Sequence, residues 1–358
     1  MSKKRKSINV ALAGVGNCAS SLIQGTAYYA IDHPIGLAHR KIGGYEASDI
    51  NYAAAFDIDD RKVGHDLSEA VYAEPNTSRK IVDLKNTGVI VQMAQPLDGA
   101  SGIAGEKVHV SRAKPANIPQ VLRDSEVNIL VNLTPTGASK ASEMYAQMAL
   151  RSECAYINAT PSKVASNGKW QTVYKRKKSI LVGDDIMDQI GSTILHRNLL
   201  SFLNERGARV DETYQLDIGG GTESKSALDK KKYEIKRNIK TAAVASVVPY
   251  VFPIVAGSSD FVDFMGNKRT SYFWIRGQYY AGANYNMDIR LTLEDGPACA
   301  GILTDIIRMV NLVQNNELGQ GSVTDLISAY GFKAPPKRIS PESVSEGIEQ
   351  LLNGHGKA

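Results

Sequence analysis

Residues 8–19 read INVALAGVGNCA, an apolar run of strand length followed at once by the pattern G-x-G-x-x-A. A helix-compatible segment, residues 19–25, comes next. Strand, glycine pattern and helix in this order form the fingerprint of a dinucleotide-binding turn. Gly14 permits the tight turn, Gly16 lets the backbone approach a pyrophosphate, and Ala19 keeps the helix close to the strand. The free N–H groups at the start of the helix would then face the phosphates.

An acidic residue follows the second predicted strand. Residues 52–56 are mostly apolar and end at Asp57, whose carboxylate could accept both ribose hydroxyls and would repel a 2′-phosphate. The sequence therefore favours NAD over NADP. Asp57 lies farther from the glycines than the roughly 20 residues typical of this motif, so residues 28–50 must form an insertion. Two other interpretations stay open, namely a glycine turn without a ligand and a different nucleotide.

Further strand-like runs alternate with helical patterns, such as residues 138–150, along the first half of the chain. The runs are residues 89–91, 127–131, 155–158 and 179–182. This alternation predicts an α/β fold with a doubly wound, Rossmann-type parallel sheet covered by helices on both faces. Ligands of such sheets bind beyond the carboxyl ends of the strands, where polar and turn residues gather in this chain. The predicted cofactor-binding residues are Gly14, Gly16, Asn17, Cys18, Ala19, Asp57, Thr134, Pro135, Thr160, Asp184 and Asp185.

The character of the sequence changes near Val210. The length of 358 residues suggests about two domains of ~150 residues each. Three strand-like runs follow, residues 213–218, 270–276 and 287–293. Such strands commonly form a largely antiparallel interface sheet. We therefore expect residues 1–200, completed by residues 296–358, to bind the dinucleotide, and residues 201–295 to form an α+β catalytic and oligomerisation domain.

Charge and cysteine content restrict the class of partner and the compartment. The 42 Lys and Arg residues and 37 Asp and Glu residues give a net charge of +5, which suits an anionic small molecule at least as well as nucleic acid. Cys18, Cys154 and Cys299 are widely separated, so we expect no disulfide framework, no zinc site and a reducing, cytoplasmic compartment. Residues 1–6 are expected to be a solvated basic tail. No run approaches the ~18 consecutive apolar residues of a membrane helix, so we expect no membrane partner. We also expect a small molecule and no nucleic acid as partner.

Three lysines, Lys232, Lys236 and Lys240, lie four residues apart and would form one stripe on a helix. Like charges at this spacing repel one another and lower one another's pKa. A bound phosphate or a developing oxyanion would offset that repulsion. An ordinary solvated helix face is the alternative that stays open.

Seven stretches together resemble the inositol-phosphate synthases, the L-myo-inositol-1-phosphate synthase family, and specifically its bacterial and archaeal branch. They are residues 14–21, 54–57, 182–186, 236–244, 257–260, 294–295 and 329–336. The resemblance implies a homologous fold, NAD as cofactor and a homotetramer. It also implies that glucose 6-phosphate is isomerised to an inositol phosphate. In that scheme C5 is oxidised, an enolate closes the ring onto C1, and the same NADH reduces the cyclic ketone.

The resemblance also assigns catalytic residues by matching motifs. They are Lys236, Lys240, Lys268, Lys333 and Asp295. In the implied scheme negative charge develops in turn on O5, on the enolate and on O1, and preorganised cations lower such barriers. A partly desolvated lysine can also carry protons. Asp184 and Asp185 fall near the nicotinamide end of the implied site.

The chain departs from the family pattern at two places. The family's lysine-serine pair after Gly-Asp-Asp-Ile is here Met187-Asp188, and a carboxylate at a phosphate site would be repulsive. The family's amide-containing segment is here residues 219–226, in which Glu223 keeps an acid and Lys225 could replace lost positive charge. The expected substrate-binding residues are Asp188, Gln189, Glu223 and Lys225.

Metal binding and rival functions stay open at this stage. The six histidines show no ligand spacing, and they are His33, His39, His65, His109, His196 and His355. Oxygen ligands such as Glu223 or Asp295 could hold a hard divalent or monovalent cation. The rival functions are a related cyclase acting on a different sugar phosphate, a net dehydrogenase, and a protein that binds its ligands without turnover.

Overall fold

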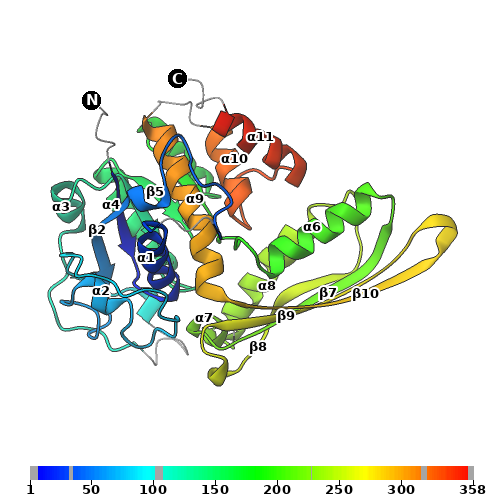
Figure 1. The fold of residues 1–358 in the computed structure, drawn as a ribbon, viewed down its shortest axis with the longest axis horizontal. Coiled ribbons are helices and arrows are strands. Elements are labelled where there is room, and N and C mark those ends of the chain that lie inside the picture. The colour runs from blue at the N-terminus through cyan, green and yellow to red at the C-terminus, as the bar shows by residue number, and fades with distance from the viewer. Residues whose placement is uncertain (1–6, 32–34, 101–107, 227, 316–320, 354–358) are drawn as a thin grey trace.

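The computed structural model describes residues 7–31, 35–100, 108–226, 228–315 and 321–353. The basic tail, His33 and His355 lie outside the described residues. A six-stranded parallel sheet has the order β3-β2-β1-β4-β5-β6 (Figure 1). Its strands are β1 (Ile8–Ala13), β2 (Ile50–Asp57), β3 (Gln92–Met93), β4 (Ile129–Asn132), β5 (Ala155–Asn158) and β6 (Leu181–Gly183). This sheet confirms the predicted doubly wound α/β fold.

Helices cover both faces of this sheet because successive side chains of each strand point to opposite sides. Ile8, Val10 and Leu12 of β1 pack into one apolar core, whereas Ala11 and Ala13 pack into another. The first core is closed by α1 (Asn17–Tyr29), α9 (Asp295–Asn315), α10 (Ser322–Gly331) and α11 (Pro341–Asn353). The second core is closed by α3 (Ile118–Asp124), α4 (Ser139–Arg151) and α5 (Gly168–Arg176). The short helix α2 (Leu67–Ala70) follows β2.

The C-terminal part of the chain returns to the first sheet through α9. This helix is long and apolar enough to cross a membrane by length and composition, but 89% of its most apolar window is buried inside the protein. Figure 1 shows α9 beside α1, while α10 packs along α9 and α11 lies beyond α10. Helix α9 is therefore the central core helix of the fold.

The second sheet has the order β10-β9-β7-β8 and extends away from the first (Figure 1). Its strands are β7 (Arg209–Gly219), β8 (Ile254–Phe261), β9 (Lys268–Gln278) and β10 (Asn284–Glu294). Strands β7 and β8 are parallel, whereas the β7–β9 and β9–β10 pairs are antiparallel, as expected for a largely antiparallel sheet. Two helices, α6 (Ser192–Glu205) and α8 (Lys230–Ala245), contribute to the core beneath it, and the short α7 (Thr222–Ser226) follows β7.

The insertion between α1 and β2 is tied to α9 by a buried arginine. The Arg308 guanidinium donates hydrogen bonds to the backbone oxygens of His39 and Arg40 and to Asp305. Both members of the Arg308–Asp305 ion pair are buried. The insertion is therefore held by interactions that no local sequence pattern indicates.

Two predictions about the fold are wrong. The run at residues 89–91 is not a strand of the main sheet, because its backbone pairs with residues 64–67, and the edge strand begins at Gln92 instead. Cys18 and Cys299 form a disulfide between α1 and α9, whereas Cys154 is free and buried. The sequence predicted no disulfide framework and so missed this pair, because the two cysteines are 281 residues apart and only the packing of α1 against α9 brings them together.

Candidate active site

A cavity of about 310 Å³ opens at the carboxyl ends of β1, β4, β5 and β6 and extends to the second sheet. The glycine turn lines one part of it. Side chains from α8, β9, α9 and the segment after α10 line another part, among them Lys236, Lys240, Arg269, Asp295 and Lys333. One cavity therefore joins the dinucleotide motif to a group of charged residues drawn from both sheets.

The glycine turn has the geometry that its sequence predicts. Gly14 has φ +96°, and a Cβ at this position would meet the Leu133 backbone oxygen at 2.9 Å. A Cβ on Gly16 would meet nothing within 4 Å, so the backbone there is open to the cavity. Asp57 lines the same part of the cavity, and its Oδ2 accepts the Val15 N–H at 2.8 Å. Asn17, Cys18 and Ala19 also line the cavity.

The strand-end residues are divided between the cavity and the protein interior. Thr134, Pro135, Thr160 and Asp185 line the cavity. Asp184 does not: it is fully buried, and its carboxylate accepts hydrogen bonds from the backbone N–H groups of residues 164–166. The placement of Asp184 as a cofactor contact is therefore wrong, because its side chain organises the loop after β5.

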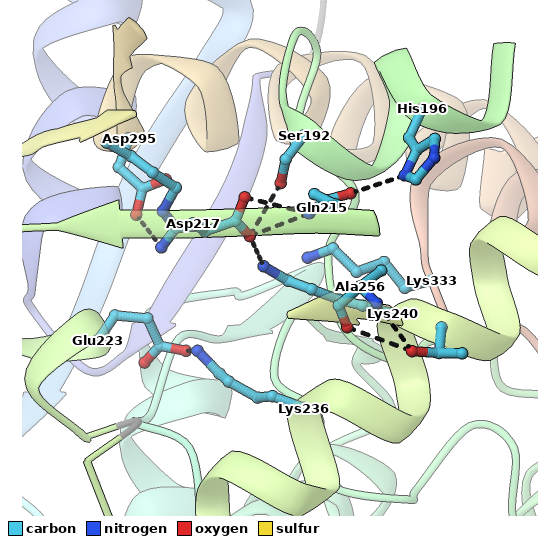
Figure 2. A network of polar contacts seen from close by, with 12 residues as sticks. Ser192, His196, Gln215, Asp217, Glu223, Lys236, Lys240, Ala256, Asp295 and Lys333 are labelled. Atoms are coloured by element: carbon cyan, nitrogen blue, oxygen red, sulfur yellow. Dashed lines mark hydrogen bonds and ion pairs between the residues drawn. The ribbon is translucent and has the colours of Figure 1, made fainter. Parts of the chain in front are cut away.

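Four cations of the site are each paired with a carboxylate. The pairs are Lys236 with Glu223, Lys240 with Asp217 at 2.5 Å, Arg269 with Asp295 at 2.7 Å, and Lys333 with Asp185 at 3.2 Å. Figure 2 shows two of these pairs, Lys236 with Glu223 and Lys240 with Asp217. The repulsion expected along the lysine stripe of α8 is therefore offset by side chains of the protein itself. Since these cations are almost completely buried, the alternative of a solvated lysine face is excluded for Lys236 and Lys240.

Burial and pairing shift the pKa values of the site in opposite directions. Burial would raise the pKa of Asp217, but the neighbouring Lys240 and Arg269 hold it below its usual value. Burial would also raise the pKa of Glu223, yet Lys236 lowers it to about 2. Burial lowers the pKa of Lys240, and the Asp217 carboxylate only partly opposes this shift. The carboxylates therefore stay ionised and hold the cations in place.

Lys333 and Asp188 respond to the same group of charges. Burial would lower the pKa of Lys333, but Asp185 and Asp188 raise it above its usual value. Burial raises the pKa of Asp188 to about 6, although Lys333 opposes this shift. Burial thus brings the pKa of Asp188 toward neutrality.

Lys268 lies away from the cavity, and its neighbour Arg269 lines it. Lys268 is exposed at the start of β9, whereas Arg269 is 9% exposed and pairs with Asp295. Side chains alternate along a strand, so adjacent residues cannot both face the site. The motif match selected the wrong member of this Lys-Arg pair.

The predicted substrate-binding residues also separate in space. Asp188 and Glu223 line the cavity, but Gln189 and Lys225 do not. Gln189 instead donates from Nε2 to the Gly36 backbone oxygen at 2.9 Å and so contacts the insertion. Of the four predicted contacts, the two acids therefore lie in the cavity.

The described residues contain no group of three or more His, Cys, Asp and Glu side chains that could hold a metal ion. Glu223 and Asp295, the two oxygen ligands named from the sequence, are both paired with cationic side chains. The geometry of the site therefore gives no support to a bound cation.

Comparison with known proteins places this arrangement in a family. A profile of the family described as Myo-inositol-1-phosphate synthase matches residues 191–296. The inositol-3-phosphate synthase of Mycolicibacterium smegmatis is 36% identical over 99% of this chain and 100% of its own length. The chain belongs to the myo-inositol-1-phosphate synthase family. The inositol-3-phosphate synthase of Corynebacterium glutamicum is 37% identical over 96% of this chain and 98% of its own length.

The fold of the myo-inositol-1-phosphate synthase family also appears in a distant solved structure. The crystal structure of inositol-3-phosphate synthase from Caenorhabditis elegans has a TM-score of 0.78, covering 99% of this chain and 86% of that one. Its sequence identity is 13%, so this likeness concerns the fold alone. The predicted family and fold are therefore both confirmed.

Two residues of the myo-inositol-1-phosphate synthase site were missed by sequence reasoning, namely Asp217 and Arg269. A signal for Asp217 was present, since Thr213, Gln215 and Asp217 are polar residues on the buried face of β7. Buried polar groups need partners, and Lys240 and Gln215 supply them to Asp217. The alternation of β9 could likewise have selected Arg269 over Lys268.

Proposed function

We propose that this protein converts D-glucose 6-phosphate to 1L-myo-inositol 1-phosphate, using NAD catalytically. The observation that carries the proposal is the single cavity that joins the glycine turn to the buried ion pairs. Membership of the myo-inositol-1-phosphate synthase family supports the same reaction. An isomerase of this kind consumes one substrate and leaves the cofactor unchanged after each turnover.

NAD fits the residues that are present. The open backbone at Gly16 lets a pyrophosphate approach the first turn of α1, where N–H groups are free to donate. The Asp57 carboxylate already accepts the Val15 N–H and would use its remaining lone pairs for ribose hydroxyls. When bound, NAD would supply a reversible hydride acceptor. Thr134, Pro135, Thr160 and Asp185 would border its nicotinamide end.

The paired cations would stabilise the negative charge that develops on the substrate. Lys240 and Lys333 are buried ammonium groups held by Asp217 and Asp185, so they need no reorganisation when charge appears on a substrate oxygen. Arg269 offers a planar fork for a phosphate or a second oxyanion. Lys236 lies on the same face of α8 as Lys240 and extends the positive surface. We assign catalytic roles to Lys236, Lys240, Lys333, Arg269 and Asp295 on this basis.

The second sheet is suited to assembly. Tyr214, Leu216 and Tyr272 are 39%, 40% and 41% exposed and lie together on the face opposite the core. An exposed apolar patch on a sheet is typical of a subunit interface. We therefore propose that this sheet forms the interface of the homotetramer that the family resemblance implies. Residues 1–200 and 296–358 would bind NAD, and residues 201–295 would provide Lys236, Lys240 and the interface. Analytical ultracentrifugation gives the mass of the assembly.

The reaction is tested with a panel of hexose and ketose phosphates in the presence of NAD. The proposal predicts that glucose 6-phosphate yields an inositol phosphate by NMR, without net accumulation of NADH. Stoichiometric NADH would indicate a dehydrogenase instead. Conversion of a different sugar phosphate, with glucose 6-phosphate unchanged, would indicate the related cyclase.

A further inference from the structure

Asp188 differs from the other carboxylates that line the cavity. Asp185, Glu223 and Asp295 each pair with a cation, Asp59 pairs with Arg61, and Asp57 accepts backbone N–H groups. Within the described chain, the Asp188 carboxylate has no hydrogen bond and no ion pair within 4 Å. Its oxygens are not among the buried polar atoms that lack partners, so they remain accessible from the cavity. This carboxylate is therefore free to accept a hydrogen bond from a ligand.

The surrounding cations are already committed to carboxylates. Lys240 and Lys333 form ion pairs with Asp217 and Asp185. An ammonium group can stabilise an oxyanion, but it has no lone pair with which to take a proton. The oxidation of a secondary alcohol releases one proton from the hydroxyl group for each hydride that leaves carbon. That proton needs an acceptor, and Asp188 is a carboxylate of the cavity with which no cation of the described chain pairs.

We infer that Asp188 accepts the proton of the substrate hydroxyl that is oxidised, and returns it when the cyclic ketone is reduced. The inference rests on the proposed function, in which NAD takes the hydride. In the forward step the C–H bond gives its hydride to the nicotinamide ring, the O–H proton passes to Asp188, and a C=O bond forms. In the last step the hydride returns to carbon and Asp188 returns its proton to oxygen, so that both groups are restored.

The electrostatic surroundings of Asp188 suit reversible proton transfer. The charged groups that face it are Lys333, Asp295, Arg269 and Lys240. Burial raises its pKa to about 6, Lys333, Arg269 and Lys240 oppose the shift, and Asp295 adds to it. A general base works best when its pKa lies near the working pH. An ionised Asp188 at pH 7 can thus take a proton and release it again.

This assignment also orients the substrate. A carboxylate repels a phosphate but accepts hydrogen bonds from hydroxyl groups. The phosphate of the sugar would therefore lie away from Asp188, and the hydroxyl groups of the ring would face it. Asp188 thereby becomes a determinant of substrate orientation as well as the proton acceptor.

Activity measurements on Asp188→Asn test the inference. Asparagine keeps the shape of the side chain but cannot take a proton, so kcat is expected to fall by about 10²–10⁴ while the Kd for NAD is unchanged. Wild-type kcat/KM should fall as the pH drops below about 6, the value to which burial raises the pKa of Asp188. Asp188→Glu should recover part of kcat and keep the acid limb. Asp83→Asn removes a carboxylate whose side chain is 90% exposed and should leave both quantities unchanged.

A titration that needs no turnover separates the two proposals. In the NAD complex of protein labelled with ¹³C at aspartate carboxyl carbons, one signal absent from Asp188→Asn should titrate near pH 6. Wild-type kcat in Asp188→Asn, or the absence of that titration, would overturn the role of Asp188. A wild-type protein that shows the titration yet does not convert glucose 6-phosphate would overturn the proposed function alone.

Discussion

Replacement of Lys240 by methionine should lower both stability and turnover, for separable reasons. Lys240 and Asp217 are 4% and 2% exposed and form an ion pair at 2.5 Å. Removing one partner of a buried pair typically costs about 3–5 kcal/mol because a charge is left uncompensated. Asp217 keeps hydrogen bonds from Gln215 and Ser192, so we expect the lower end, about 3 kcal/mol. Loss of a preorganised cation should also lower kcat by about 10²–10³.

The double variant Lys240→Met, Asp217→Asn distinguishes the two effects. With both charges removed, the free energy of unfolding should return to within about 1 kcal/mol of the wild-type value, since no buried charge is left unpaired. Turnover should stay low, because the cation is still missing. Urea unfolding followed by circular dichroism gives the stability, and NMR of the product gives kcat. A single variant as stable as wild type would refute the buried-pair argument, and a double variant with wild-type turnover would refute the catalytic role.

Three further perturbations test other parts of the site. Arg269→Ala should lower kcat by about 10²–10³, because it removes a buried cation of the cavity. Lys268→Ala changes an exposed side chain and should leave kcat unchanged. A loss of turnover in Lys268→Ala but not in Arg269→Ala would contradict the placement of β9. Asp57→Ala should weaken NAD binding as measured by calorimetry, and an unchanged Kd would exclude the ribose contact. Cys299→Ser removes the disulfide to Cys18 and should lower the free energy of unfolding by about 2–5 kcal/mol under non-reducing conditions. A variant as stable as the wild type would show that the disulfide contributes little to stability.

The fold was predictable because its signals are local. The apolar run before Gly14 and the acid at Asp57 each indicate a strand end through the neighbouring residues alone, and the structure places Gly14 and Asp57 at the cavity. Residues 89–91 were wrongly predicted to be a strand of the main sheet, because an apolar run does not indicate which segment its backbone will pair with. Their backbone hydrogen-bonds to residues 64–67 and not to a strand of the sheet.

The pairing of charges was less predictable than the charges themselves. The lysines of α8 could be read from their spacing, but their partners Asp217 and Glu223 come from β7 and α7 and meet them only in the folded chain. The link between Cys18 and Cys299 has the same origin. Contacts between segments that are distant in the sequence therefore determine which of the predicted residues lie in the site.

The fate of the hydride tests the central claim most directly. Glucose 6-phosphate deuterated at C5 is incubated with the protein and NAD, and the product is examined by NMR and mass spectrometry. Because the same cofactor should oxidise and then reduce one bound substrate, the account predicts that the inositol phosphate keeps the deuterium at that carbon. Product without the label, or deuterium that accumulates in NADH, would contradict it.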